Sequence, residues 1–140
     1  MAPDLSTERL LAILRDTIVG SVRRQGPDMS ARQFAIFLVT YIEDDQHTVR
    51  GLAARLDISK PAITRSLDRM AELGLVKRGP DPRDRRSVLI LRTRKGQDML
   101  GDLRGYLTTA ARIPAARIPN PRPTPAKVQS IRPITRRRIA

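Results

Sequence analysis

The chain has 140 residues, of which 27 are Lys or Arg and 14 are Asp or Glu, so its formal net charge is +13. That length has room for one domain with a modest core and a tail. So large a positive charge indicates a polyanionic partner, nucleic acid first and an anionic membrane surface second. The absence of cysteine excludes disulfides and thiolate metal sites. No run approaches the roughly 18 apolar residues of a membrane span, and the acidic N-terminal segment lacks a basic secretory start. We therefore expect a cytoplasmic protein that does not enter a membrane.

Two helices are predicted before the middle of the chain. In residues 5–24 the apolar side chains recur at near-helical spacing, in a stripe that is wide for a helix with a single neighbour. These side chains are Leu10, Leu11, Ile13, Leu14, Ile18 and Val22. The second predicted helix covers residues 31–44. Ser30 as its N-cap, with Gln33 three residues later, makes a capping box.

A tight pair of helices is predicted over residues 49–56 and 60–73. Asp57 lies between them and tolerates the left-handed conformation that a helix C-terminus often needs. Ser59 is a good N-cap, and Pro61 falls in the first turn, where its missing N–H costs little. Two helices joined by so short a turn form a helix-turn-helix.

A hairpin and a last helix complete the pattern. Residues 75–78 and 86–91 are predicted strands, with a turn at residues 79–84 between them. From Thr93 onward the apolar period is again helical. The order of helix, helix-turn-helix, hairpin and helix predicts a mainly α fold with a small β-hairpin wing (α+β), which is a winged helix-turn-helix flanked by N- and C-terminal helices.

The second helix of the pair has an outward face that suits the major groove of DNA. Its apolar stripe should face the core, which leaves Lys60, Thr64, Arg65 and Arg69 mostly on the outside. Arginine can bind guanine through two hydrogen bonds, and a threonine methyl can touch thymine. The alternative is an ordinary amphipathic helix whose charges are solvated.

The hairpin tip, GPDPRDRR at residues 79–86, is rich in arginine and stiffened by proline. An arginine at such a tip can enter a narrow minor groove, where the negative potential is strongest. Prolines lower the entropy that the tip loses on binding. We expect Asp84 to hold the guanidinium of Arg86 at a fixed angle through paired hydrogen bonds. The alternative is a solvated hairpin whose charges have no partner.

Residues 48–96 resemble the MarR family of winged-helix transcriptional regulators. The resemblance rests on Asp-Pro-x-Asp-Arg-Arg in the wing, the later Thr-x-x-Gly, and Ser-x-Pro-x-x-Thr-Arg at the helix start. It implies a homodimer with interlocked terminal helices and two recognition helices in successive major grooves. Arg92 and Arg94 depart from the family, which usually has an apolar residue and a proline there. The chain also has fewer helical residues after the wing than family members usually have.

The resemblance also implies the residues that contact DNA. At the start of the recognition helix, those expected to meet bases or nearby phosphates are Ser59, Lys60, Pro61, Ala62, Thr64 and Arg65. Arg86 would be the minor-groove arginine, oriented by Asp84, with Arg83 and Arg85 near phosphates. Arg69, on the outward face of the same helix, completes the predicted site.

We expect no cofactor, no metal and no enzymatic activity. The acidic run at residues 43–47 ends in the lone histidine, and with no cysteine nearby a solvated loop is favoured over a transition-metal site. No nucleophile–base pair is suggested by the sequence. A small-molecule effector is left open, because the family often senses one but the C-terminal half is shortened here.

The chain divides into residues 1–111, a winged-helix domain, and residues 112–140, a basic tail rich in Pro and Arg. The first part has 19 basic and 14 acidic residues, whereas the tail has eight basic residues, no acidic residue and six of the eleven prolines. Closely spaced prolines predict an extended or disordered arm. Such an arm would add phosphate contacts to DNA, or be a solvated appendage, or fold over a partner subunit.

Taken together, the sequence predicts a homodimeric regulator that binds double-stranded DNA sequence-specifically and represses transcription. The alternative is a nucleoid-associated or adaptor protein with sequence-tolerant DNA binding and a tail that recruits a partner. A competition assay separates the two, because a regulator prefers its own site by about a thousandfold or more.

Overall fold

The computed structural model describes residues 6–24 and 26–112. The helices are α1 (Thr7–Arg23), α2 (Ala31–Ile42), α3 (Val49–Leu56), α4 (Lys60–Glu72) and α5 (Arg94–Arg112). The strands are β1 (His47–Thr48), β2 (Val76–Asp81) and β3 (Asp84–Arg92). No helix within the described ranges is long and apolar enough to cross a membrane. The predicted winged helix-turn-helix with flanking helices is confirmed.

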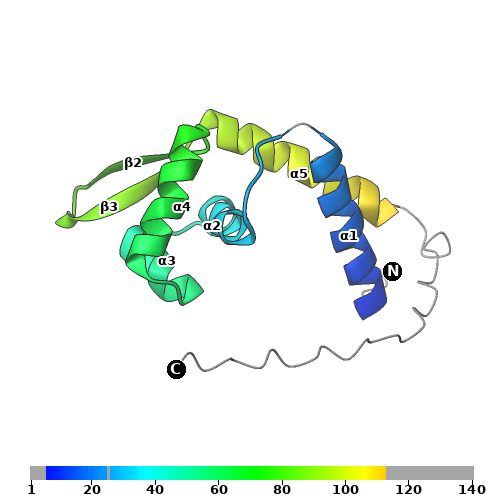
Figure 1. Ribbon diagram of the computed structural model, residues 1–140, viewed down its shortest axis with the longest axis horizontal. Helices are drawn as coiled ribbons and strands as arrows, with labels where there is room; N and C mark the ends of the chain where they lie inside the picture. The colour runs from blue at the N-terminus through cyan, green and yellow to red at the C-terminus, as the bar shows by residue number, and fades with distance from the viewer. Residues whose placement is uncertain (1–5, 25, 113–140) are drawn as a thin grey trace, which may run out of the picture.

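The molecule has two parts that meet along α5 (Figure 1). One part holds α2, α3, α4 and the hairpin, and the other is α1, which packs on α5. The contact between α1 and α5 is close at Gly20, where an added Cβ would lie 3.3 Å from the ring of Tyr106.

Arg15 hydrogen-bonds Asp16 on α1 at 2.7 Å, and this bond lowers the pKa of the Asp16 carboxyl.

The core lies where the helix-turn-helix packs on α2 and the sheet. Its buried members are Ile36, Phe37, Tyr41, Leu52, Ala53, Ile63, Leu67, Met70, Val76, Ile90 and Leu100. The stripe expected to face inward from α4 is therefore buried as predicted, because Ile63, Leu67 and Met70 are each 0% exposed. Burying this stripe fixes which face of α4 is left to the solvent.

Local signals set the turns around the helix-turn-helix. The capping box forms, since Ser30 Oγ accepts the N–H of Gln33 at 3.2 Å while Gln33 Oε1 accepts that of Ser30 at 2.9 Å. Asp57 has φ 51° and ends α3 in the left-handed conformation. Ser59 caps α4 by accepting the N–H of Ala62 at 3.4 Å. These three predictions are confirmed. They could be made from the sequence because each depends only on residues a few positions apart.

The sheet is antiparallel, has the order β1-β3-β2, and differs from prediction in two ways. β1 was not predicted, since its two residues are too short to show alternation, and it pairs His47 with Ile90. The hairpin is also longer than expected. Its strands pair as far as Asp81 with Asp84, so the predicted turn at residues 79–84 shrinks to Pro82 and Arg83.

A buried hydrogen-bonded junction, here called the Tyr41 junction, ties α5 to the winged part. Tyr41 Oη donates to the carbonyl of Leu75 at 2.5 Å and accepts the N–H of Thr93 at 3.0 Å. Thr93 Oγ1 donates to the carbonyl of Gly74 at 2.7 Å and accepts the N–H of Gly96 at 3.0 Å. The α4–β2 turn, the end of β3 and the first turn of α5 are therefore held together at one point.

Arg92, which departs from the family pattern, caps the C-terminal end of α2. Its Nε donates to the carbonyl of Thr40 and its Nη2 to that of Glu43, both at 2.8 Å. These carbonyls have no partner within the helix, so a guanidinium suits them. The guanidinium also lies 5.9 Å from the centroid of the Tyr41 ring.

Candidate nucleic-acid interface

The N-terminal turn of α4 presents most of the predicted recognition residues to solvent. Ser59, Lys60, Pro61 and Arg65 are exposed, and Thr64 is half-buried. Ala62 differs, because it is only 7% exposed and is on the side of α4 that faces the N-terminal end of α2. It can therefore offer a partner only a small part of its methyl group.

The two arginines of α4 differ in their partners. Arg69 Nη1 lies 3.3 Å from Glu72 Oε2, one turn along the helix, in a pair that is exposed on both sides. Exposed pairs of this kind contribute little, so this one can open when a stronger anion arrives. Arg65 has no ion pair within the described part of the chain. Its guanidinium is thus available without breaking any such contact.

The wing brings four predicted residues to the tip of one hairpin. Arg83, Asp84, Arg85 and Arg86 are all exposed. Asp81 Oδ1 accepts the backbone N–H of Arg83, and Asp84 Oδ1 accepts that of Arg86, each at 2.9 Å. Both aspartates therefore fold the turn through their backbone neighbours.

The expected role of Asp84 needs correction. It was predicted to pair with the guanidinium of Arg86, but it binds the backbone N–H of that residue instead. An aspartate readily makes this local bond two residues on, since no long side chain has to be ordered. Asp84 thus sets the path of the backbone at Arg86, while the guanidinium itself stays exposed.

The wing and α4 are neighbours. Arg78 of β2 donates a hydrogen bond to Asp68 of α4, so an ion pair links the base of the hairpin to the recognition helix. The hairpin projects beyond α4 as a free two-stranded arm (Figure 1). This arrangement lets one ligand contact both elements.

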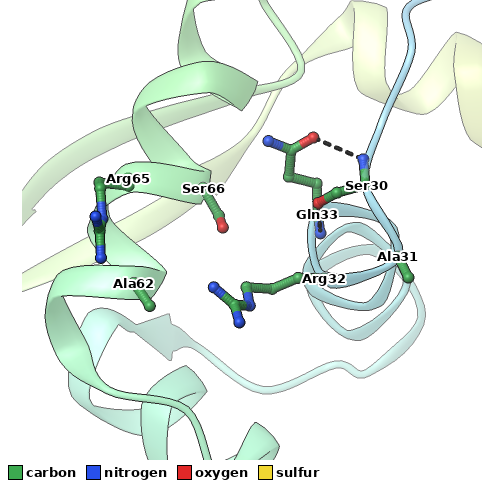
Figure 2. A pocket seen from close by; sticks show the side chains of 7 residues that line it. All are labelled: Ser30, Ala31, Arg32, Gln33, Ala62, Arg65 and Ser66. Atoms are coloured by element: carbon green, nitrogen blue, oxygen red, sulfur yellow. Dashed lines mark hydrogen bonds between the residues drawn. The ribbon is translucent and has the colours of Figure 1, made fainter. Parts of the chain in front are cut away.

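A hollow of about 460 Å³ opens between α4 and the N-terminal end of α2 (Figure 2). It is lined by Ser30, Ala31, Arg32, Gln33, Ala62, Arg65 and Ser66. Four of these residues belong to the α2 end, which is not part of the site predicted from the sequence. The capping box located that helix end, but nothing in the sequence placed it beside α4.

The acidic run at residues 43–47 contributes to the fold. Glu43 Oε1 accepts a hydrogen bond from Arg55 Nη2 at 2.9 Å, and its carbonyl oxygen accepts one from Arg92. Among the described residues no group of three or more His, Cys, Asp or Glu is placed to hold a metal ion.

A helix-turn-helix followed by a two-stranded wing defines the winged-helix class. Residues 28–87 match the model of the MarR family of transcriptional regulators, so the resemblance to that family is confirmed over these residues. Members of this family are transcriptional regulators and not enzymes. No curated protein sequence matches the chain.

Solved structures agree with this assignment. The transcriptional regulator Tm0710 from Thermotoga maritima is 26% identical, with a TM-score of 0.60 and coverage of 73% of this chain and 72% of its own. MarR is also 26% identical, with a TM-score of 0.55 and coverage of 72% and 74%. Reduced AbfR, solved bound to DNA, shares the fold at 23% identity, with a TM-score of 0.55 and coverage of 72% and 71%.

Proposed function

We propose that this protein is a homodimeric repressor that binds double-stranded DNA sequence-specifically, with α4 in the major groove and the wing in the adjacent minor groove. The observation that carries the proposal is that the start of α4 and the hairpin tip are both exposed and basic, on two neighbouring elements that the ion pair of Asp68 with Arg78 links at the base of the hairpin. The structural relative AbfR was solved bound to DNA.

In the major groove, Arg65 is the residue that reads sequence. It is exposed and without an ion pair in the described part of the chain, so both edges of its guanidinium can approach a base. Two parallel hydrogen bonds to guanine are the commonest specific contact of arginine. Ser59, Lys60 and Thr64 surround it and would contact nearby bases or phosphates.

In the minor groove, Arg86 is the inserted residue, and Arg83 and Arg85 lie near the flanking phosphates. In the described part of the chain these three arginines have no ion pair, and the two acids of the tip, Asp81 and Asp84, accept hydrogen bonds from backbone N–H groups. A turn braced in this way loses less entropy on binding than a mobile loop.

The dimer is supported by an apolar stripe that α1 leaves exposed. Its members and their exposed fractions are Leu10 48%, Leu11 60%, Leu14 55%, Ile18 38% and Val22 77%. The opposite face of α1, at Ala12 and Thr17, is already buried. A contiguous apolar stripe on a helix marks an interaction site, and a twofold axis would bury the same stripe of both subunits.

In such a dimer the two α4 helices would enter half-sites about one helical turn, roughly 34 to 36 Å, apart. Occupying a promoter in this way blocks access to it, which is the simplest route to repression.

A selection from random DNA followed by competition tests the proposal. Wild-type protein should prefer its selected duplex over random duplex by about a thousandfold or more. Arg65→Ala should lose about 1 to 3 kcal/mol on the selected duplex and relax discrimination at one base pair. Equal binding of selected and random duplex by the wild type would instead support the nucleoid-associated alternative.

A further inference from the structure

The hollow between α2 and α4 is positively charged and contains no acid. Arg32 and Arg65 contribute its two cations, and neither has an ion pair among residues 6–24 and 26–112. Figure 2 shows Arg32 reaching from α2 toward α4 across the open space. Two guanidiniums without a neighbouring carboxylate favour an anion at this place.

The N-terminal end of α2 adds backbone donors to the same hollow. The first N–H groups of a helix have no partner within it, and here those of Ala31 and Arg32 are such groups. The N–H of Gln33 is taken by Ser30 Oγ. The positive end of the helix dipole acts in the same direction as the guanidiniums.

Ser66 is an independent indication that the hollow receives a ligand. Its side chain is buried on α4, with the residue only 7% exposed, and no hydrogen bond of its hydroxyl is present in the described structure. Figure 2 shows the hydroxyl oxygen directed into the space between the two helices. The hydroxyl opens onto the hollow, so its proton is available to an acceptor that binds there.

We propose that this hollow is a phosphate-binding site, with Arg32, the Ser66 hydroxyl and the α2 end as its donors. The Arg32 guanidinium, a hydroxyl donor and a helix N-terminus together match a phosphate group, and the charge of Arg65 at the edge of the hollow adds to the positive potential. The hollow shares Arg65 with the outward face of α4. A phosphate of the DNA backbone is therefore the source that reaches it while α4 lies in the groove. This proposal deepens the proposed function and rests on it, because a backbone phosphate bound in the hollow would set how far α4 enters the major groove.

The first arm of the test measures binding to random-sequence duplex, which needs no known operator, as a function of salt. Arg32→Ala should weaken binding roughly tenfold and lower the salt slope by about 0.9 per protomer, on random and selected duplex alike. Ser66→Ala should weaken binding with an unchanged slope, since it removes a donor and no charge. Arg104→Ala is the matched control, because it removes one exposed arginine of α5 outside the hollow.

The second arm uses inorganic phosphate and the DNA-free protein. Phosphate, compared with chloride at equal ionic strength, should raise the melting temperature of wild type more than that of Arg32→Ala. Phosphate could stabilise wild type more than Arg32→Ala while Arg32→Ala and Arg104→Ala lose DNA affinity equally. In that case the hollow binds free phosphate, and its assignment to a phosphate of the DNA backbone is wrong. If neither arm separates Arg32→Ala from Arg104→Ala, the site does not exist. Failure of wild type to bind any duplex would overturn the proposed function, and the phosphate arm would still decide about the hollow.

Discussion

Gly96 is the residue on which the Tyr41 junction depends. A Cβ added there would lie 1.6 Å from Tyr41 Oη and 2.7 Å from the carbonyl oxygen of Leu75. Neither neighbour can retreat, because the hydroxyl is held by Leu75 and Thr93 inside the core. The glycine is therefore required for space and not for an unusual backbone angle.

We predict that Gly96→Ala lowers the free energy of unfolding by about 3 kcal/mol, through overpacking and loss of the Tyr41 hydrogen bonds. Denaturant unfolding measures this change. Gly101→Ala is the control on the same helix, where an added Cβ meets nothing within 4 Å. It should raise the free energy by about 0.5 to 1 kcal/mol, because alanine is the better helix former. Similar effects of the two substitutions would contradict the steric account.

The role of a single residue could be predicted from the sequence where its hydrogen-bond partner is near in the chain. Asp57, with its left-handed backbone, and Ser59, with its bond to Ala62, could both be predicted because their partners lie within a few positions. The partner of Asp84 was predicted wrongly, since a backbone N–H competes with a guanidinium at the same sequence distance. Arg32 was not predicted as a site residue. It lines the same hollow as Ser66, and the two residues are distant in the sequence.

At the scale of elements, the wing is a braced hairpin whose turn contains only Pro82 and Arg83. Asp81 and Asp84 each accept one N–H across two residues, so they hold both sides of the turn. The backbone is thereby fixed at Arg83 and at Arg86. The rigidity of the wing thus comes from these two carboxylates as well as from proline.

We predict that Asp84→Ala weakens binding to the selected duplex about three- to tenfold, because the backbone at Arg86 loses its brace. Asp84→Asn is the matched control, since it removes the same charge but keeps the Oδ1 acceptor, and it should bind at least as well as wild type. Fluorescence anisotropy at one salt concentration compares the two. If Ala and Asn at this position bind equally well, the hydrogen bond has no role in DNA binding.

The order and type of the helices were predictable because their apolar stripes have a clear period, as in Ile63, Leu67 and Met70 on α4. The sheet was predicted less well. β1 exists only because His47 and Thr48 pair with Ile90 and Leu89 of β3, and the last pairs of the hairpin depend on the turn at Pro82 and Arg83. Pairing of this kind is a long-range property that a local pattern does not show.

At the scale of the whole molecule, α1 has one face on α5 and a second, apolar face with no partner in the described chain. We predict that Leu11→Glu shifts the protein from dimer to monomer, because a charge would have to be buried in the proposed interface. Light scattering after size exclusion measures the change. Leu91→Glu, at an exposed apolar position on β3, should leave the dimer intact. A wild-type monomer, or a dimer that survives Leu11→Glu, would disprove the proposed interface.

The strongly basic tail is the other feature of the whole molecule. Residues 112–140 carry eight of the 27 basic residues, and residues 113–140 lie outside the described structure. We propose that the tail is a separate segment that adds phosphate contacts. Deleting it should weaken binding on every sequence and flatten the salt slope, by at most about 7 per protomer. Titrations of selected and random duplex at several salt concentrations test this. An unchanged slope would leave the tail no part in DNA binding.

The Tyr41 junction bears on how such a dimer would measure its operator. It bonds the first turn of α5 to the end of β3 and to the α4–β2 turn, at the edge of the core. The winged part therefore cannot pivot against α5 at this point. If α1 and α5 of two subunits form the interface, the distance between the two α4 helices of the dimer is fixed. Operators lengthened or shortened by one base pair between their halves would then be rejected instead of accommodated.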